Sequence, residues 1–399
     1  MEKNIMNKFS RFLSISIISL ISFFGTTSAR ETSDNYKTFF VTGEVSGDRL
    51  GAWYLQQLKQ EHPAVSCTAI GGSYLQKEGA QLKNNSSELA IGAVSIRKFL
   101  THVPTMRTIF KNIKNYINED NFNEVVLIDC PLVNLRLAKH IKKKHPKIKI
   151  TYIAPPEMWL WGTWRIHKTL KKYCDDVIVI YPFEKDWYAQ KGFETTFKGY
   201  PFYKTFVPYF DFHKNKSNAI AFLIGSRKSE IETSIPIFTK TINNLHKQYP
   251  NLEFVIPVAH NFSIDEIKQK FNIGIDKIHF IQDDHVKNQT LAQCCLAVTV
   301  PGTATLELAL LKTPTIITYK APLFTYWLAK SIIKTKYVGL PNLLLKKEIC
   351  KELIQKNCTE EKIMEEIQKI YLCFLEKNKQ DSYQRLLDDL EPIRTLLKS

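Results

Sequence analysis

A carboxylate follows an apolar run in "EVVLIDCPLVNLRLAKH", where Asp129 ends the run and Pro131 opens a helical pattern. At the carboxyl end of a buried strand, such a group could accept a proton from an attacking hydroxyl. The same position suits an N-cap of the following helix. The residue alone leaves both interpretations open.

A second candidate site lies in "IAFLIGSRKSEIETSIPIF", where an apolar run gives way to Gly225, Ser226 and Arg227 before a helical pattern. Small turn residues, helix N–H groups and a guanidinium together favour a bound diphosphate. A surface ion pair between Arg227 and Glu230 is the alternative.

A third candidate is "LAVTVPGTATLELALLKTP", in which Gly302 and Thr303 form a turn and Glu307 follows in a helix. The turn exposes N–H groups, and the Glu307 carboxylate could bind both hydroxyls of a ribose. A capping box fails because Ala304 stands where Ser or Thr is needed, but an interaction with the helix dipole stays open. The second and third motifs together predict a nucleotide diphosphate held by the second half of the chain.

The loop in "TFFVTGEVSGDRLGAWYLQQLK" combines glycines at four-residue spacing with the acids Glu44 and Asp48. The spacing is not that of a dinucleotide loop, and the acids would repel a pyrophosphate. They favour a ligand that donates hydrogen bonds, such as a sugar. Alternatively, the glycines allow close helix packing and the acids favour the helix N-terminus.

Two further segments could contact lipids. The stretch "PEMWLWGTWR" places three tryptophans beside Arg165, and these rings could stack on sugars, grip acyl chains or pack a core. The stretch 88–111 mixes apolar and basic residues, as an ordinary amphipathic helix or a membrane-facing patch would.

Short apolar runs alternate with helical patterns from Tyr36 onward, which predicts parallel sheets with crossover helices. The pattern restarts after the segment 199–216. We therefore expect an α/β protein of two Rossmann-like doubly wound domains, 36–205 and 206–360, followed by C-terminal helices at 361–399. The expected strands are "TFFVT", "SCTAI", "EVVLID", "IKITYIA", "DVIVIY", "NAIAFLIG", "LEFVIPVA", "KIHFIQ", "LAVTV" and "TPTIITYK".

The composition of the chain indicates which kinds of partner and cofactor to expect. The chain has 399 residues and a formal net charge of +16, which suits a membrane surface or phosphorylated ligands. No nucleic-acid-reading motif accompanies the lysines, so no nucleic-acid partner is expected. The eight cysteines form no C-x-x-C pair, and no metal motif is present, so neither a disulfide framework nor a metal site is expected. Residues 1–35 contain a basic start and an apolar run, as a signal peptide or anchor does.

Taken in order, the motifs resemble the lipid-A-disaccharide synthase family, inverting glycosyltransferases of the two-domain GT-B type with a central cleft. The similarity runs from about Phe39 to the C-terminal helices. It rests on "GEVSGD", "ELAIGAVSI", "IDCP", "WLW" with Arg165, "PFE", "GSR", "GTATLE", "FTYWLAK", "YVGLPNLL" and "KELIQ".

The resemblance implies transfer of diacylglucosamine from its UDP derivative to the 6-hydroxyl of diacylglucosamine 1-phosphate. The UDP-sugar is then the donor substrate, with no cofactor and no metal. Asp129 matches the family's proposed base, and Glu44 lies in the loop near the acceptor. The residues expected to bind substrate are Ser226, Arg227, Gly302, Thr303, Ala304, Thr305, Glu307, Asn342, Gln355, Ser46, Asp48 and Arg165.

The chain departs from the family pattern at Leu132, where a second acid is common, and at Tyr200, where His is usual. Further departures are Pro155, Glu157, Ile224 and Pro301. Because an exported enzyme would lack UDP-sugar, we expect a cytoplasmic protein, peripheral at the inner membrane; a homodimer is left open. The alternatives are a GT-B transferase or epimerase of a non-acylated UDP-sugar, and a non-catalytic exported binding protein.

Overall fold

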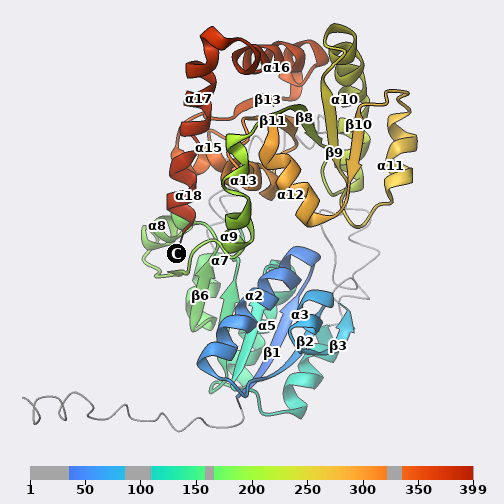
Figure 1. The fold of residues 1–399 in the computed structure, drawn as a ribbon. Coiled ribbons are helices and arrows are strands. Elements are labelled where there is room, and N and C mark those ends of the chain that lie inside the picture. Colours follow the sequence, from blue (N-terminus) through green and yellow to red (C-terminus); the bar gives the residue numbers. More distant parts are fainter. Residues whose placement is uncertain (1–35, 86–107, 109, 158–165, 321–334, 399) are drawn as a thin grey trace, which may run out of the picture.

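Two parallel sheets, one in each half of the chain, form the framework of the molecule (Figure 1). The structure is a computed structural model that describes residues 36–85, 108, 110–157, 166–320 and 335–398. The expected signal-like segment at 1–35, the tryptophan cluster with Arg165, and most of the stretch 88–111 lie outside the described residues.

The first sheet has the strand order β3-β2-β1-β4-β5-β6-β7, and every neighbouring pair is parallel. Its strands are β1 (Lys37–Thr42), β2 (Ser66–Gly71), β3 (Gln81–Asn85), β4 (Glu124–Ile128), β5 (Lys149–Ile153), β6 (Asp176–Val179) and β7 (Thr196–Phe197).

The second sheet repeats this order as β10-β9-β8-β11-β12-β13, again with parallel pairs. Its strands are β8 (Ser217–Leu223), β9 (Glu253–Pro257), β10 (Ile278–Ile281), β11 (Cys294–Thr299), β12 (Thr315–Tyr319) and β13 (Lys351–Ile354). In both sheets the order reverses beside the first strand, which makes β1/β4 and β8/β11 the topological switch points.

Helices cover both faces of the first sheet and bury two apolar clusters. One face carries α2 (Val45–Glu61) and α3 (Ser73–Lys77). The other carries a helix at residues 110–119, α5 (Pro131–Lys144), α7 (Ile166–Tyr173) and α8 (Pro182–Ala189). Because both faces are buried, the central strands are continuously apolar, as in "FFV" of β1.

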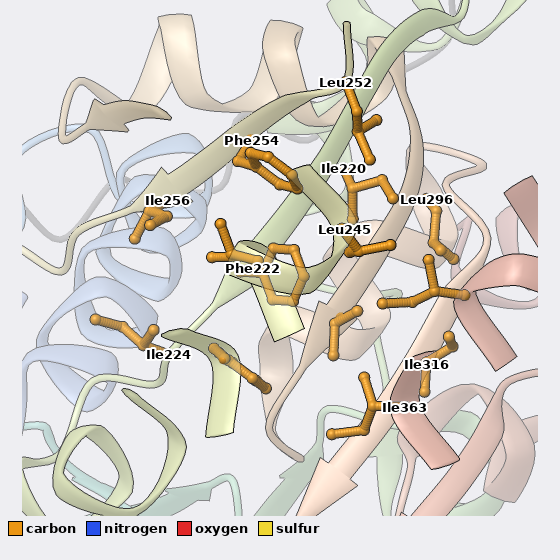
Figure 2. Packing of buried hydrophobic residues seen from close by; sticks show 14 of the residues in the cluster. Ile220, Phe222, Ile224, Leu245, Leu252, Phe254, Ile256, Leu296, Ile316 and Ile363 are labelled. Carbon is orange, nitrogen blue, oxygen red and sulfur yellow. The ribbon is translucent and has the colours of Figure 1, made fainter. Parts of the chain in front are cut away.

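The second sheet is covered in the same way. The cluster in Figure 2, with Phe222 and Phe254 near its centre, lies under one group of helices, and a second cluster lies under another. The first group is α10 (Lys228–Gln248), α11 (Ile264–Phe271), α16 (Glu360–Leu375) and α17 (Gln380–Asp388). The second group is α9 (Tyr203–Phe206), α12 (Asp284–Gln293), α13 (Thr303–Leu310), α15 (Leu340–Leu345) and α18 (Glu391–Leu397). Short 3-10 turns occur at η2 (Val207–Tyr209), η3 (Phe212–Lys214), η4 (Gln355–Asn357) and η5 (Lys377–Lys379).

The ten expected strands all form, and the doubly wound α/β prediction is confirmed. The sequence reasoning missed β3, β7 and β13. Each of them is an edge strand, and their sequences "QLKNN", "TF" and "KELI" are short or polar because an edge strand has only one neighbour.

The C-terminal helices are part of the second domain and of its junction with the first. Ile363 and Ile367 of α16 are buried in the second domain's core. At the junction, the Tyr200 N–H donates to the carbonyl of Leu397 in α18 over 2.9 Å. Figure 1 shows α18 running back to lie near α8 and α9, so the last helix ties the two domains together.

A buried carboxylate anchors the end of the first sheet that lies away from the loops discussed below. Glu124, at the start of β4, has no exposed surface and accepts hydrogen bonds from Tyr36 (3.2 Å), Tyr54 (3.1 Å) and Thr151. Lys149 pairs with it over 3.2 Å. A buried charge requires such partners because burial removes it from water.

Replacing Glu124 with Leu is expected to lower the free energy of unfolding by about 3 kcal/mol, because buried hydroxyls lose their acceptor. Lys149→Met is the control, and it should cost less than about 1 kcal/mol because this lysine is half exposed. Urea denaturation of both variants measures the difference. Equal losses in the two variants would contradict the anchoring role of Glu124.

Candidate active site

Four loops extend from the carboxyl ends of the strands at the two switch points. In the first domain, Glu44 follows β1 and Asp129 follows β4. In the second, Arg227 follows β8 and Gly302 follows β11. Ligands of doubly wound sheets bind at this place, so each of the sequence motifs lies where a site is expected.

The backbone at Asp129 is held in an unusual conformation. Asp129 and Cys130 have φ angles of 48° and 44°, in the left-handed region that few non-glycine residues occupy. The Asp129 carbonyl accepts hydrogen bonds from the Tyr152 hydroxyl (2.6 Å) and the Asn134 amide (2.8 Å), and its N–H donates to Ile153 (3.0 Å). Such strain persists only where surrounding contacts enforce it, and it concentrates at functional sites.

Asp129 is not the N-cap of the following helix. That position belongs to Cys130, and no side chain caps α5 there. The N-cap interpretation is therefore wrong, and the half-buried carboxylate is available for chemistry.

The surroundings of Asp129 make it a stronger base than an ordinary aspartate. Burial raises the pKa of its carboxyl, and the negative charge of Glu44 raises this pKa further. The Cys130 N–H and the Arg227 guanidinium act in the opposite direction. Since Arg227 belongs to the second domain, its charge acts on Asp129 across the junction.

Glu157 is a third carboxylate of this site, and the sequence reasoning recorded it only as a departure. It follows β5, whose last residue Ile153 pairs with Ile128 of β4. The surrounding protein atoms exclude water from the Glu157 carboxyl and raise its pKa. The charge of Asp129 raises this pKa further, and the charge of Arg227 lowers it. The signal that could have found it is its position four residues after a strand that neighbours β4.

The loop after β8 forms around an internal anion. The Glu230 carboxylate accepts hydrogen bonds from the N–H groups of Ser226 (3.1 Å) and Arg227 (3.2 Å) and pairs with the Arg227 guanidinium (3.2 Å). Gly225, at φ 94°, lies against this carboxylate, where a Cβ would collide with it. The ion pair expected as the alternative therefore exists, and its donors are the groups that would hold a phosphate.

Arg227 remains available to a ligand despite this pair. Its side chain is 57% exposed, and an ion pair with that exposure contributes little to stability. Ser226 is exposed beside it, and its carbonyl accepts a hydrogen bond from Asn261 (3.1 Å).

The loop after β11 offers backbone donors. Gly302 has a φ of 143° and precedes α13 without a side-chain cap. Within the part of the chain that the structure describes, the N–H groups of Thr303 and Ala304 have no acceptor. The Thr305 hydroxyl donates to the Gly302 carbonyl over 2.7 Å, so this side chain holds the turn.

Tyr200 is a second residue that sequence reasoning did not assign to the site. Its ring is 4% exposed, and its hydroxyl is buried without a hydrogen-bond partner among the described residues. Burial raises its pKa and Glu307 raises it further, whereas Arg49 lowers it. Charges from both domains, Arg49 of the first and the expected ribose-binding acid Glu307 of the second, therefore act on Tyr200.

Several expected substrate-binding residues have structural roles. Asp48 is 2% exposed, and its carboxylate accepts from the N–H groups of Gly72 (2.7 Å), Tyr74 (2.8 Å) and Leu75 (3.3 Å), so it caps α3. Asn342 is fully buried, and its amide bonds to Ile349, Cys350 and Glu352. Both side chains are saturated by internal partners.

The remaining expected substrate-binding residues differ in how exposed they are to solvent. Ser46 is exposed at the start of α2, and Gln355 is buried at the start of η4 with a φ of 55°. Gly51 of α2 lies 3.0 Å, measured from an added Cβ, from the Leu75 side chain. Gly51 thus allows close packing of α2 on α3, as the alternative interpretation had it, while the Glu44 charge acts on Asp129.

Comparison with known proteins decides the family. Residues 38–398 match the model of the lipid-A-disaccharide synthetase family. The chain is 35% identical to lipid-A-disaccharide synthase 1 of Legionella pneumophila strain Philadelphia 1, over 81% of this chain and 84% of the relative. The chain belongs to the lipid-A-disaccharide synthase family. It is also 31% identical to the synthase of Coxiella burnetii strain Dugway, over 84% of this chain and 88% of the relative.

The family assignment makes the chain a glycosyltransferase of lipid A disaccharide synthesis. Solved structures agree on the fold. A UDP-GlcNAc 2-epimerase from Neisseria meningitidis bound to UDP-GlcNAc aligns with a TM-score of 0.55 at 11% identity, over 90% of this chain and 95% of that one. A spinosyn rhamnosyltransferase aligns with a TM-score of 0.53 at 10% identity, over 90% and 98%.

Replacing Tyr200 with Phe is expected to separate binding from stability. The free energy of unfolding should rise by about 1 kcal/mol, because a buried hydroxyl without a partner is removed. UDP affinity should fall roughly tenfold if the hydroxyl meets the nucleotide. Calorimetric titration and urea denaturation measure the two effects.

Tyr383→Phe provides the matched control for Tyr200. Its buried hydroxyl donates to the Cys295 carbonyl over 2.7 Å, so this variant should lose stability and keep UDP affinity. Unchanged UDP affinity in Tyr200→Phe would exclude a ligand contact by this hydroxyl.

The pH dependence of kcat/KM should shift when a charged neighbour of Asp129 is removed, because that neighbour changes the pKa of Asp129. Glu44→Gln removes a negative neighbour, which makes ionisation of Asp129 easier and lowers its pKa. The acidic limb of the pH–rate profile should then move to lower pH by roughly half a unit to one unit. Arg227→Gln should move it to higher pH, and shifts of the same sign in both variants would refute this electrostatic account.

Proposed function

We propose that the chain condenses UDP-2,3-diacylglucosamine with 2,3-diacylglucosamine 1-phosphate, forming a β-1,6-linked disaccharide 1-phosphate and UDP. The family assignment supports this reaction. The observation that carries its mechanism is the position of Asp129 opposite Arg227 across the domain junction. A base and an anion-binding group on opposite sides of a sugar are what an inverting displacement requires.

In the proposed step, the acceptor 6-hydroxyl gives its proton to the Asp129 carboxylate. The oxygen then forms a bond to C1 of the donor sugar, and the bond from C1 to the diphosphate oxygen breaks. UDP leaves with the bonding electron pair. Arg227 and the N–H groups of Thr303 and Ala304 would stabilise the charge that develops on the diphosphate.

Glu157 would supply the second acid of this site. Family members commonly carry an acid shortly after the aspartate, where this chain has Leu132, which is 50% exposed. Glu157 follows the neighbouring strand β5, and the charge of Asp129 raises the pKa of its carboxyl. It would therefore place a second carboxyl near the base without a carboxylate at position 132.

The acceptor would lie beside Glu44 and Ser46, and the ribose beside Glu307. We propose that the protein works at the cytoplasmic surface of the inner membrane, where both acylated substrates would be reached. None of the helices in the described residues is long and apolar enough to cross a membrane.

The assay that tests the reaction is UDP release in the presence of both acylated substrates. Asp129→Asn should lower kcat by on the order of 100-fold to 10,000-fold, the usual contribution of a general base. Its thermal unfolding midpoint should match that of the wild type.

Asp120→Asn is the matched control, since it makes the same chemical change at an exposed position before β4. It should leave turnover unchanged. Wild-type turnover in Asp129→Asn would remove Asp129 as the base, and equal turnover with a non-acylated UDP-sugar would favour the alternative transferase.

A further inference from the structure

Three adjacent helices on one face of the first sheet are strongly basic. Neither α5 nor α7 contains an acidic residue, and the adjoining helix at 110–119 has only Glu119. The basic residues of this layer are Lys111, Lys114, Arg136, Lys139, Lys142, Lys143, Lys144, Lys168, Lys171 and Lys172. By contrast, α2 on the opposite face has Asp48 and Glu61 beside Arg49 and Lys59.

The three helices present their charge in one direction. Ile117, Leu137 and Leu170 from the three helices are buried in one apolar cluster on the same face of the sheet. Their opposite sides must therefore face away from the sheet together. His145 at the end of α5 also bonds to Asn118 of the neighbouring helix over 2.9 Å, which fixes the two helices side by side.

A shallow depression lies on the surface of α5. Its volume is about 390 Å³, and its lining residues are Arg136, Lys139, His140, Lys143 and Lys144. The His140 Nε2 atom is buried without a hydrogen-bond partner among the described residues. The depression thus combines four cations with one polar atom that lacks a partner.

The cations of the depression are not neutralised within the described chain. Lys142 pairs with Asp175 over 2.6 Å, but Arg136, Lys139, Lys143 and Lys144 form no ion pair with a described carboxylate. All four of these side chains are exposed. On α16 of the second domain, by contrast, Lys369 pairs with Glu365 and Glu366.

We propose that this face, the basic face formed by residues 110–119, α5 and α7, binds the anionic headgroups of a membrane surface, with a lipid phosphate in the depression of α5. Charge complementarity carries the proposal, because clustered lysines and arginines are attracted to anionic lipids. The lining residues include no Phe, Tyr or Trp, the large rings on which nucleic-acid bases usually stack.

The position of α5 connects this face to the chemistry. The helix begins at Pro131, directly after Asp129 and Cys130, and Arg136 lies five residues further. At 1.5 Å per residue, that separation is about 8 Å along the helix axis. The inference rests on the proposed function only for the choice of a lipid partner, since acylated substrates reside in a membrane.

The test is sedimentation of the full chain with vesicles. Wild-type protein should bind phosphatidylcholine vesicles that contain phosphatidylglycerol, and added salt should weaken this binding. Replacing Arg136, Lys139, Lys143 and Lys144 together with Gln should lower the affinity by on the order of 100-fold to 1,000-fold. Turnover with detergent-dispersed substrates should stay at the wild-type level.

The control variant removes the same charge from the second domain, at the exposed residues Lys240, Lys247, Lys377 and Lys398. It should keep vesicle binding within a fewfold of the wild type. Equal losses in both variants would reduce the effect to net charge and overturn the proposal. Tighter binding of a DNA or RNA duplex than of anionic vesicles, lost only in the α5 variant, would assign the face to nucleic acid instead.

A third variant separates this proposal from the proposed function. Asp129→Asn should bind anionic vesicles as the wild type does, because Asp129 lies outside the depression. Vesicle binding measures the basic face without any turnover. Loss of activity with normal vesicle binding therefore tests the proposed reaction. Loss of vesicle binding in the α5 variant alone tests the proposed membrane contact.

Discussion

The proposed reaction depends on like charges that are held together against their repulsion. Glu44, Asp129 and Glu157 extend from the ends of three strands that lie side by side in one sheet, β1, β4 and β5. Parallel strands bring their carboxyl ends to one edge, so the fold itself imposes this proximity. The Arg227 guanidinium offsets part of the repulsion from the opposite domain. What remains raises the proton affinity of Asp129, and the strained backbone beneath it is fixed by Tyr152 and Asn134.

The sequence predicted the fold well because buried parallel strands must be apolar along their whole length. Such runs are visible without any tertiary information, and Asp129 and Arg227 could be recognised because each stands directly after one. The edge strands β3, β7 and β13 lack this signal. Asp48 was taken for a ligand-binding group because its type fits that role, and Asn342 because of the family resemblance. Their saturation by Gly72, Tyr74 and Cys350 depends on contacts that only the folded chain brings together.

Three departures from the family pattern, at Pro301, Leu132 and Tyr200, concern residues of the candidate site or its neighbours. Pro301 has no N–H to donate, whereas the N–H groups of Thr303 and Ala304 have no acceptor among the described residues. Leu132 carries no charge, whereas Glu157 follows the neighbouring strand β5. Tyr200 stands where a histidine ring could carry a proton, and its buried hydroxyl has no hydrogen-bond partner among the described residues. These changes alter which atoms line the site, while the strand ends that position them stay in place.

The carboxylate of Glu230 has a consequence for the cycle of substrate binding and product release. In the free protein it occupies the Ser226 and Arg227 donors that a diphosphate would use. Being part of the chain, it acts as a tethered competitor whose local concentration does not fall on dilution. If the loop binds the diphosphate as proposed, an incoming nucleotide would exchange with this carboxylate, and the carboxylate would replace a departing UDP without exposing unpaired N–H groups. In the proposed cycle the loop would alternate between two anions, and this exchange would limit how tightly the product is retained.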